Sequence, residues 1–206
     1  PENSADEVDV EALLKVDPNY STKEDYQIHF VSQSVIKDFS DLPHVTLHEN
    51  SADEKGLAVI TKTGAQPEFL NIKERDSWMM QYWDDTNQFY IKADEDARAA
   101  YGGQTITLNF VIYLTQTLTL EAEYTDASGE AKSVLVTCDT KKEWTTLSVT
   151  LENVALEGKM EGGADVSLFA RDVDILRLNA VYLDEVSEES VPQVGLVQTR
   201  FETDSY

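Results

Sequence analysis

The chain has 206 residues, enough for one sizeable domain with additional terminal segments. Its 39 Asp and Glu residues against 16 Lys and Arg residues give a formal net charge of −23. A field of that sign repels phosphate backbones and anionic membrane surfaces, so the composition argues against nucleic acid and acidic lipid as partners.

The amino-terminal third is the least regular part of the sequence. Residues 1–19 are acidic and poor in large apolar side chains, so we expect a flexible acidic linker or tail there. Tyr26–Val35 and Leu42–Leu47 have strand-like composition, and Pro43 confines the second segment to a sheet edge or to the start of a strand. Asn50–Gly56 is polar and predicts a turn.

The central part alternates short strand-like segments with polar turns. We expect strands at Leu57–Thr63, Phe69–Ile72, Trp78–Trp83 and Gln88–Ala93. Because Asp84-Asp85-Thr86-Asn87 separates the last two with turn-forming residues, those two strands are predicted to form a hairpin. Asp94–Ala100 is the one short helix expected, and it ends near Gly102-Gly103.

From Gln104 onward, apolar and polar residues alternate with a period of two, which sends successive side chains to opposite faces of a sheet. One face of each segment is apolar: Ile106, Leu108, Phe110, Ile112 and Leu114; Leu118, Leu120, Ala122 and Tyr124; Leu147, Val149 and Leu151. Further strands are expected at Val134–Cys138, Asp165–Ala170 and Ile175–Leu183. The fold class predicted is all-β, a jelly-roll-like β-sandwich over residues 20–184. Residues 185–206 form an acidic carboxy-terminal segment that regains strand-forming residues.

Several phrases of this sequence resemble the carbohydrate-binding-module-like jelly-roll domains of bacterial glycan-handling proteins. They are Asn87–Asp94, Phe110–Tyr113 followed by Leu118–Asp126, Trp144–Leu151, Gly163–Asp165 and the strand Leu176–Leu183. The resemblance covers Leu57–Leu183. It departs from the pattern at Leu114-Thr115, where such modules often carry an aspartate.

The resemblance implies a secreted or cell-surface location and a structural calcium ion near the last strand, with Asp184 as the implied ligand. Other sequence features bear on the same questions. The lone Cys138 excludes an intrachain disulfide framework, and no apolar stretch is long enough for insertion into a membrane.

Strand parity predicts the carbohydrate-binding residues. Sugar rings stack on aromatic side chains, and their hydroxyls bond to amides and other polar groups. Residues that share a strand with the core positions but point the other way are left for a ligand: Trp83, Tyr90, Gln81, Asn109 and Tyr113. If their strands are neighbours, Trp83 and Tyr90 form a stacking platform and the other three give polar contacts around it. The alternative is that these rings pack under the amino-terminal segment or cover a sheet face that binds nothing.

Enzyme signatures are weak. His44 and His48 lie four residues apart on a predicted strand, about 13 Å at ~3.3 Å per residue, which is too far for one metal ion. Paired carboxylates such as Asp84-Asp85 are what glycoside hydrolysis requires, but here they fall in turns of a very acidic chain. We therefore expect no catalytic residues.

Three functions remain open on the sequence. The leading hypothesis is a non-catalytic glycan-binding accessory module of a secreted or cell-surface bacterial protein, with a polysaccharide or oligosaccharide as its partner. The second is a structural or adhesive β-sandwich that mediates protein contacts, and the third is a small glycan-active enzyme. The ligand and the oligomeric state are not readable from the sequence.

Overall fold

A computed structural model describes residues 36–62, 64–139 and 142–186 of the chain. The predicted linker at residues 1–19, the strand at Tyr26–Val35 and residues 187–206 lie outside the described residues. No helix among the described residues is long and apolar enough to cross a membrane.

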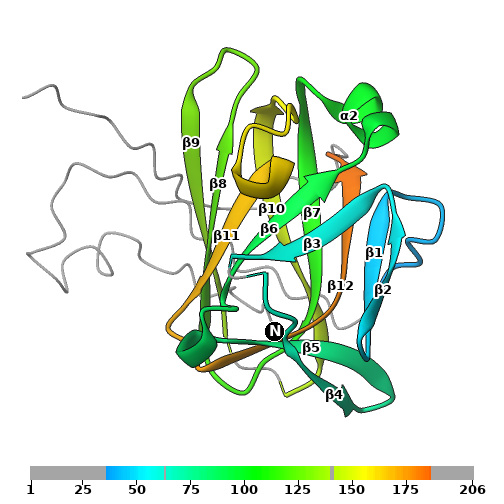
Figure 1. Cartoon of the computed structure of the whole chain (residues 1–206), viewed down its shortest axis with the longest axis vertical. Coiled ribbons are helices and arrows are strands. Elements are labelled where there is room, and N and C mark those ends of the chain that lie inside the picture. Colours follow the sequence, from blue (N-terminus) through cyan, green and yellow to red (C-terminus); the bar gives the residue numbers. More distant parts are fainter. Residues whose placement is uncertain (1–35, 63, 140–141, 187–206) are drawn as a thin grey trace, which may run out of the picture.

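The described residues fold as two antiparallel sheets packed face to face, which confirms the all-β sandwich (Figure 1). One sheet has seven strands, with β10, β7, β12, β1 and β2 in order and β5 and β4 joined along β12. The second has five, in the order β3, β6, β11, β8 and β9. The strands are β1 (His44–His48), β2 (Ser51–Lys55), β3 (Leu57–Thr61), β4 (Glu68–Ile72), β5 (Arg75–Gln81), β6 (Gln88–Ala93), β7 (Gln104–Tyr113), β8 (Leu118–Thr125), β9 (Ala131–Cys138), β10 (Trp144–Val154), β11 (Val166–Arg171) and β12 (Ile175–Glu185).

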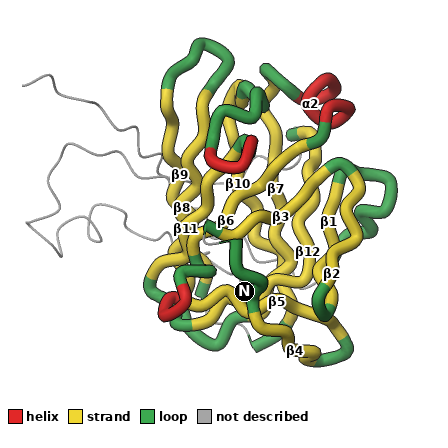
Figure 2. The backbone as a smooth tube through the Cα atoms, viewed as in Figure 1, coloured by secondary structure: helices red, strands yellow, loops and turns green. Residues whose placement is uncertain are grey.

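Three short helical turns complete the described structure. They are η1 (Tyr82–Asp84), α2 (Glu95–Tyr101) and η2 (Glu161–Gly163). The predicted helix is confirmed as α2, and the Asp94 side chain caps it by accepting a hydrogen bond of 2.8 Å from the Ala97 N–H. Figure 2 shows η1 and α2 at opposite ends of the sandwich.

The core lies between the sheets and consists of the side chains that the period-two pattern selected. Phe110 on β7, Leu120 on β8 and Leu147 on β10 are each 0% exposed. A second apolar cluster covers the outer face of the seven-stranded sheet, where Ile36, Phe39 and Leu42 pack against residues of β7, β10 and β12. The segment before β1 therefore covers a sheet face that would otherwise be open to water.

The turn predicted over Asn50–Gly56 is wrong. Ser51–Lys55 is a strand, β2, paired with β1, although its sequence Ser-Ala-Asp-Glu-Lys is polar. In this edge strand only Ala52 packs against the core and the other four residues are exposed, so the polar composition does not exclude a strand. Pro43 directly precedes β1, which confirms its predicted place at the start of a strand, and β1 itself is internal because it pairs with both β12 and β2.

The predicted hairpin of Trp78–Trp83 with Gln88–Ala93 is also wrong. β5 pairs with β4 and β12 in the seven-stranded sheet, whereas β6 pairs with β3 and β11 in the five-stranded sheet. Residues 82–87 thus cross from one sheet to the other.

Candidate functional site

Tyr82 and Trp83 form the exposed aromatic pair of the described structure. Their side chains are 56% and 55% exposed, and among the described residues they are the large hydrophobic side chains that stand out from the surface. They lie on η1, directly after β5, at the end of the sandwich away from α2 (Figure 2). Two adjacent aromatic side chains that are exposed to water do not contribute to core packing, so they are candidates for binding a ligand or a partner.

The turn that carries the two rings is held by internal hydrogen bonds. The Thr86 hydroxyl accepts a bond of 2.7 Å from the Gln81 N–H, and the Asp84 carboxylate accepts one of 3.0 Å from the Thr86 N–H. Asp85 closes the turn in the left-handed region, with φ of 62°, and donates its N–H to the Tyr82 carbonyl. These bonds satisfy the backbone of a short 3₁₀ turn, so its geometry is fixed before any ligand arrives.

The same turn is anchored to neighbouring strands. The Asn87 side-chain amide donates a 3.2 Å hydrogen bond to the Ala170 carbonyl at the end of β11, and the Ala170 N–H donates one of 2.9 Å back to the Asn87 carbonyl. On the other side, the Tyr82 N–H lies 3.4 Å from the Asp174 carbonyl, just before β12. The rings are therefore presented from a rigid junction of the two sheets.

The rings meet edge to face. Their centroids are 5.4 Å apart and their planes are inclined by 79°. This arrangement is favourable between aromatic quadrupoles, and it stabilises the pair while both rings remain exposed.

The surroundings of the pair are acidic. Asp84 and Asp85 follow it in the chain, and the Asp174 carboxylate accepts a 3.0 Å hydrogen bond from the Gln116 amide. The nearby cation Arg171 is engaged elsewhere, since its guanidinium pairs with Glu121 and lies 5.0 Å from the centroid of the Phe169 ring.

The five residues predicted from strand parity are not brought together. Trp83 is exposed as expected, but Gln81 on β5 is 1% exposed. Asn109 and Tyr113 lie on the outer face of the seven-stranded sheet, and Tyr90 on β6 belongs to the five-stranded sheet. The sequence prediction assumed adjacent strands, and the crossover at residues 82–87 removes that adjacency.

Asn109 and Tyr113 are buried rather than presented. Tyr113 is 7% exposed, contacts the Trp144 ring edge to face at 5.7 Å and lies under the Lys73 ammonium. Asn109 is 6% exposed and accepts a 2.6 Å hydrogen bond from the Ser148 hydroxyl. For Tyr113, the alternative that the rings pack under the amino-terminal segment describes the structure, since residues before β1 pack against its cluster.

Tyr90 lies on the outer face of the five-stranded sheet and is half-buried. Its hydroxyl donates a 3.1 Å hydrogen bond to the Glu161 carboxylate on η2. Burial, followed by this bond to a carboxylate, raises the pKa of Tyr90 above its ordinary value. The Tyr90 hydroxyl is thus already hydrogen-bonded to a residue of η2.

Asp184 on β12 is engaged by a cation of the chain itself. Its Oδ2 lies 2.5 Å from the Lys37 ammonium, and its Oδ1 accepts a hydrogen bond from the Glu185 N–H. No cluster of three or more His, Cys, Asp or Glu side chains suited to a metal ion occurs among the described residues. Asp184 is thus paired with Lys37 in this structure, and calcium binding near the last strand stays a prediction.

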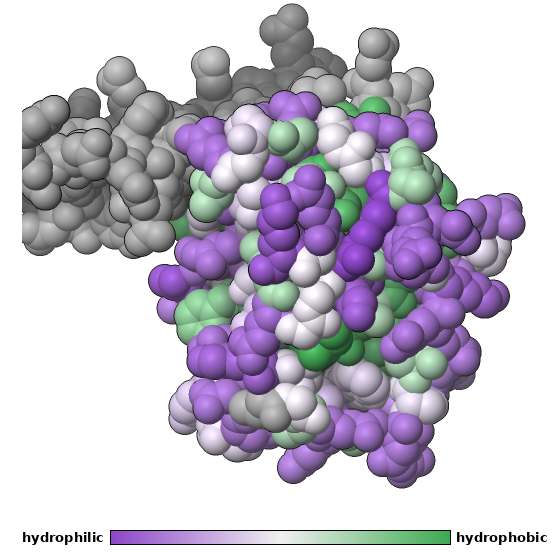
Figure 3. Space-filling model, turned by 45° about the horizontal axis from the view of Figure 1, so that its top comes forward, coloured by the Kyte–Doolittle hydropathy of each residue, from purple (hydrophilic) through white to green (hydrophobic). Residues whose placement is uncertain are grey.

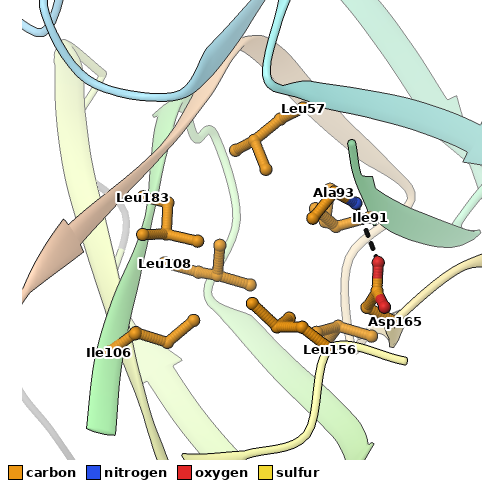
Figure 4. A pocket seen from close by; sticks show the side chains of 9 residues that line it. Leu57, Ile91, Ala93, Ile106, Leu108, Leu156, Asp165 and Leu183 are labelled. Atoms are coloured by element: carbon orange, nitrogen blue, oxygen red, sulfur yellow. Dashed lines mark hydrogen bonds between the residues drawn. The ribbon is translucent and has the colours of Figure 1, made fainter. Parts of the chain in front are cut away.

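One small pocket opens between the two sheets near α2 (Figure 4). It is lined by Leu57, Ile91, Ala93, Ile106, Leu108, Leu156, Asp165, Val166 and Leu183. Its one charged group, Asp165, already accepts hydrogen bonds from the N–H groups of Ala93 and Gly158. Such a lining leaves no free polar group for a sugar hydroxyl, which makes the exposed pair the better site.

Tyr82 is the functional candidate that the sequence did not identify. Extending the strand to Trp83 placed Tyr82 on the same side as Trp78 and Met80, which is the core side. The structure ends β5 at Gln81 and turns both rings outward. The usable signal was the run Tyr82-Trp83-Asp84-Asp85, in which two aromatic residues directly precede a polar turn.

Comparisons with known proteins add little to this site. No protein-family model matches the chain, and no curated protein matches it. A solved structure of the Clostridium thermocellum endo-1,4-beta-D-xylanase 10B CBM22-1–GH10 modules complexed with xylohexaose is similar, with 13% identity and a TM-score of 0.37 over 81% of this chain and 29% of that one. The enzymatically active domain of bacteriophage CBA120 tailspike protein 4 is similar with 10% identity and a TM-score of 0.33, over 64% of this chain and 19% of that one. At such low identities and scores, neither likeness supports a statement about ligand or activity.

Proposed function

We propose that this chain is a non-catalytic glycan-binding module that belongs to a secreted or cell-surface bacterial protein. The observation that carries the proposal is the Tyr82–Trp83 pair, two aromatic rings more than half exposed on a turn that hydrogen bonds hold in place. Flat apolar rings beside carboxylate and amide groups provide both contacts that a sugar needs, stacking for its C–H face and acceptors for its hydroxyls.

The face of the molecule shown in Figure 3 favours solubility over assembly. Figure 3 shows hydrophilic side chains over most of the face in view, with smaller apolar areas between them. A large contiguous apolar face, which permanent protein interfaces require, is absent from this view. A small aromatic site on a strongly charged surface suits a soluble binding module.

The competing function is an adhesive or structural β-sandwich that uses the same rings for a protein contact, because exposed aromatic residues also anchor protein interfaces. A glycan array probed with the full chain separates the two. Our proposal expects retention on at least one glycan and a decrease for the variant Trp83→Ala. Retention on no glycan would overturn it.

The non-catalytic part of the proposal has its own test. The full chain is incubated with each glycan that it retains, and released reducing sugar is measured over time. We expect no release above that of the glycan alone. Release that continues in proportion to protein concentration would overturn the assignment as a binding module and favour the enzyme hypothesis.

A further inference from the structure

The geometry of the aromatic pair points to a narrower ligand class. We propose that the Tyr82–Trp83 pair takes a single sugar ring of a soluble, uncharged oligosaccharide, and not a flat crystalline polysaccharide or a polyanionic glycan. This inference rests on the proposed glycan-binding function and goes beyond it by naming the form and charge of the ligand.

The first argument is the angle between the rings. Crystalline polysaccharides present many sugar rings in one plane, and a protein matches them with aromatic rings that lie in one plane as well. The planes of Tyr82 and Trp83 are inclined by 79° at a centroid distance of 5.4 Å. Only one of the two rings can then lie flat against a given sugar, while the other contacts its edge.

The turn directs the two side chains away from each other. Tyr82 and Trp83 are consecutive residues of a 3₁₀ turn, in which three residues complete about one revolution, so neighbouring side chains point about 120° apart. The bonds of Thr86 to Gln81 and Asp84 hold the turn closed.

The second argument is charge. Asp84 and Asp85 directly follow the rings, and Asp174 contacts the Tyr82 backbone. The guanidinium of Arg171 is already paired with Glu121. A carboxylated or sulfated sugar placed on the rings would face these carboxylates in a protein of net charge −23. Neutral hydroxyls, in contrast, donate hydrogen bonds to carboxylates.

The chain supplies a specific optical probe for the test. It has three tryptophans, of which Trp78 and Trp144 are each 8% exposed while Trp83 is 55% exposed. A ligand on the aromatic pair should therefore change the fluorescence of Trp83. In the variant Trp83→Phe the fluorescence change should disappear, while calorimetry still detects binding through the Phe ring.

The experiment titrates the full chain with neutral oligosaccharides from monosaccharide methyl glycosides to hexasaccharides, with polygalacturonate as the anionic probe and with microcrystalline cellulose and chitin as flat surfaces. We expect affinity to level off at the disaccharide, no retention on the flat surfaces and no binding of polygalacturonate. Trp83→Ala should weaken binding at least about fivefold, and Tyr90→Ala, on the other sheet, should leave it unchanged.

The failures are distinguishable. Affinity that keeps rising up to the hexasaccharide, retention on a crystalline surface or binding of polygalacturonate would overturn the ligand class while leaving glycan binding intact. Binding to none of the neutral or anionic glycans would overturn the proposed function as well. Self-association of the parent that Trp83→Ala abolishes would assign the rings to a protein contact and overturn both.

Discussion

The ring of Phe39 lies stacked on the ring of Tyr182, with centroids 4.8 Å apart and planes inclined by 10°. The contact joins the segment before β1 to the outer face of the seven-stranded sheet. Phe39→Ala should lower the free energy of unfolding by about 2 kcal/mol, because the variant loses both the burial of the Phe39 ring and its stacking contact with Tyr182. Urea unfolding followed by circular dichroism measures the change. Phe39→Leu, which keeps an apolar contact, should cost less, and equal costs would show that stacking contributes nothing.

Phe110 tests the division of β7 into a core face and an outer face. Its side chain is 0% exposed between the two sheets, so Phe110→Asp would bury a charge without a partner. We expect a cost on the order of 5 kcal/mol or more, enough to unfold the domain at room temperature. Circular dichroism and thermal melting measure it. Thr119→Asp, on the outer face of β8 opposite Arg171, is the matched control and should remain folded. A stable Phe110→Asp variant would refute the assignment of faces.

Asp165 and Arg98 hold η2 and α2 against β6. The carboxylate of Asp165, whose side chain is 1% exposed, accepts hydrogen bonds from the Ala93 N–H at 2.8 Å and from Arg98 Nη2 at 3.0 Å. Arg98→Met would leave this buried carboxylate without its cation, so the free energy of unfolding should fall by about 3 kcal/mol. Urea unfolding measures the loss. Lys132→Met removes an exposed pair with Glu130 and should cost much less. Similar costs for the two variants would contradict the structural role of Asp165.

His48 gives the fold a pH dependence of known sign. Its two ring nitrogens lie 3.2 Å from the Asp76 carboxylate and 3.0 Å from that of Asp53. The hydrogen bond to Asp76 raises the pKa of His48 above its ordinary value of 6.5 in the folded state. A raised pKa means that the contribution of His48 is fully present below pH 6.5 and is lost as the pH rises through the folded-state pKa.

Asp76 determines the low pH at which the contact between His48 and Asp76 stops stabilising the fold. Hydrogen bonds from Asn71 and then from His48 hold its pKa below 3.8, so its contribution is present above that pH and is lost as the pH falls through the folded-state pKa. His48→Gln should therefore be more destabilising at about pH 5.5 than at about pH 8.5. Urea unfolding of the parent and the variant at both pH values measures the difference. A cost that is the same at both would contradict the contact, and Asp76→Asn should reduce the difference.

The parts that the sequence predicted are those that local chemistry decides. The alternation from Ile106 to Leu114 is a property of one strand, and a strand with one apolar face must bury it. The short helix expected over Asp94–Ala100 similarly depends on only a few residues. These features appear in the structure where the pattern puts them.

The predictions that are wrong depend on which strands become neighbours in the folded protein. The residues Asp84-Asp85-Thr86-Asn87 favour a turn, but a turn does not determine which sheet the next strand joins. β5 pairs with β12, about a hundred residues later in the chain, and this non-local pairing separates Trp83 from Asn109 and Tyr113. The end of β5 at Gln81 depends on the hydrogen bonds of Thr86, which a parity argument does not include. Of the two exposed rings, parity selected Trp83 and did not select Tyr82.

The most direct test of the account is calorimetry of the parent and of Trp83→Ala with a neutral oligosaccharide that the array identifies. Because Trp83 is 55% exposed, the account predicts that the variant keeps its unfolding free energy within about 0.5 kcal/mol and loses at least about 1 kcal/mol of binding free energy. An unchanged affinity would show that the ring is a bystander, and an unfolded variant would show that it belongs to the packing of the fold.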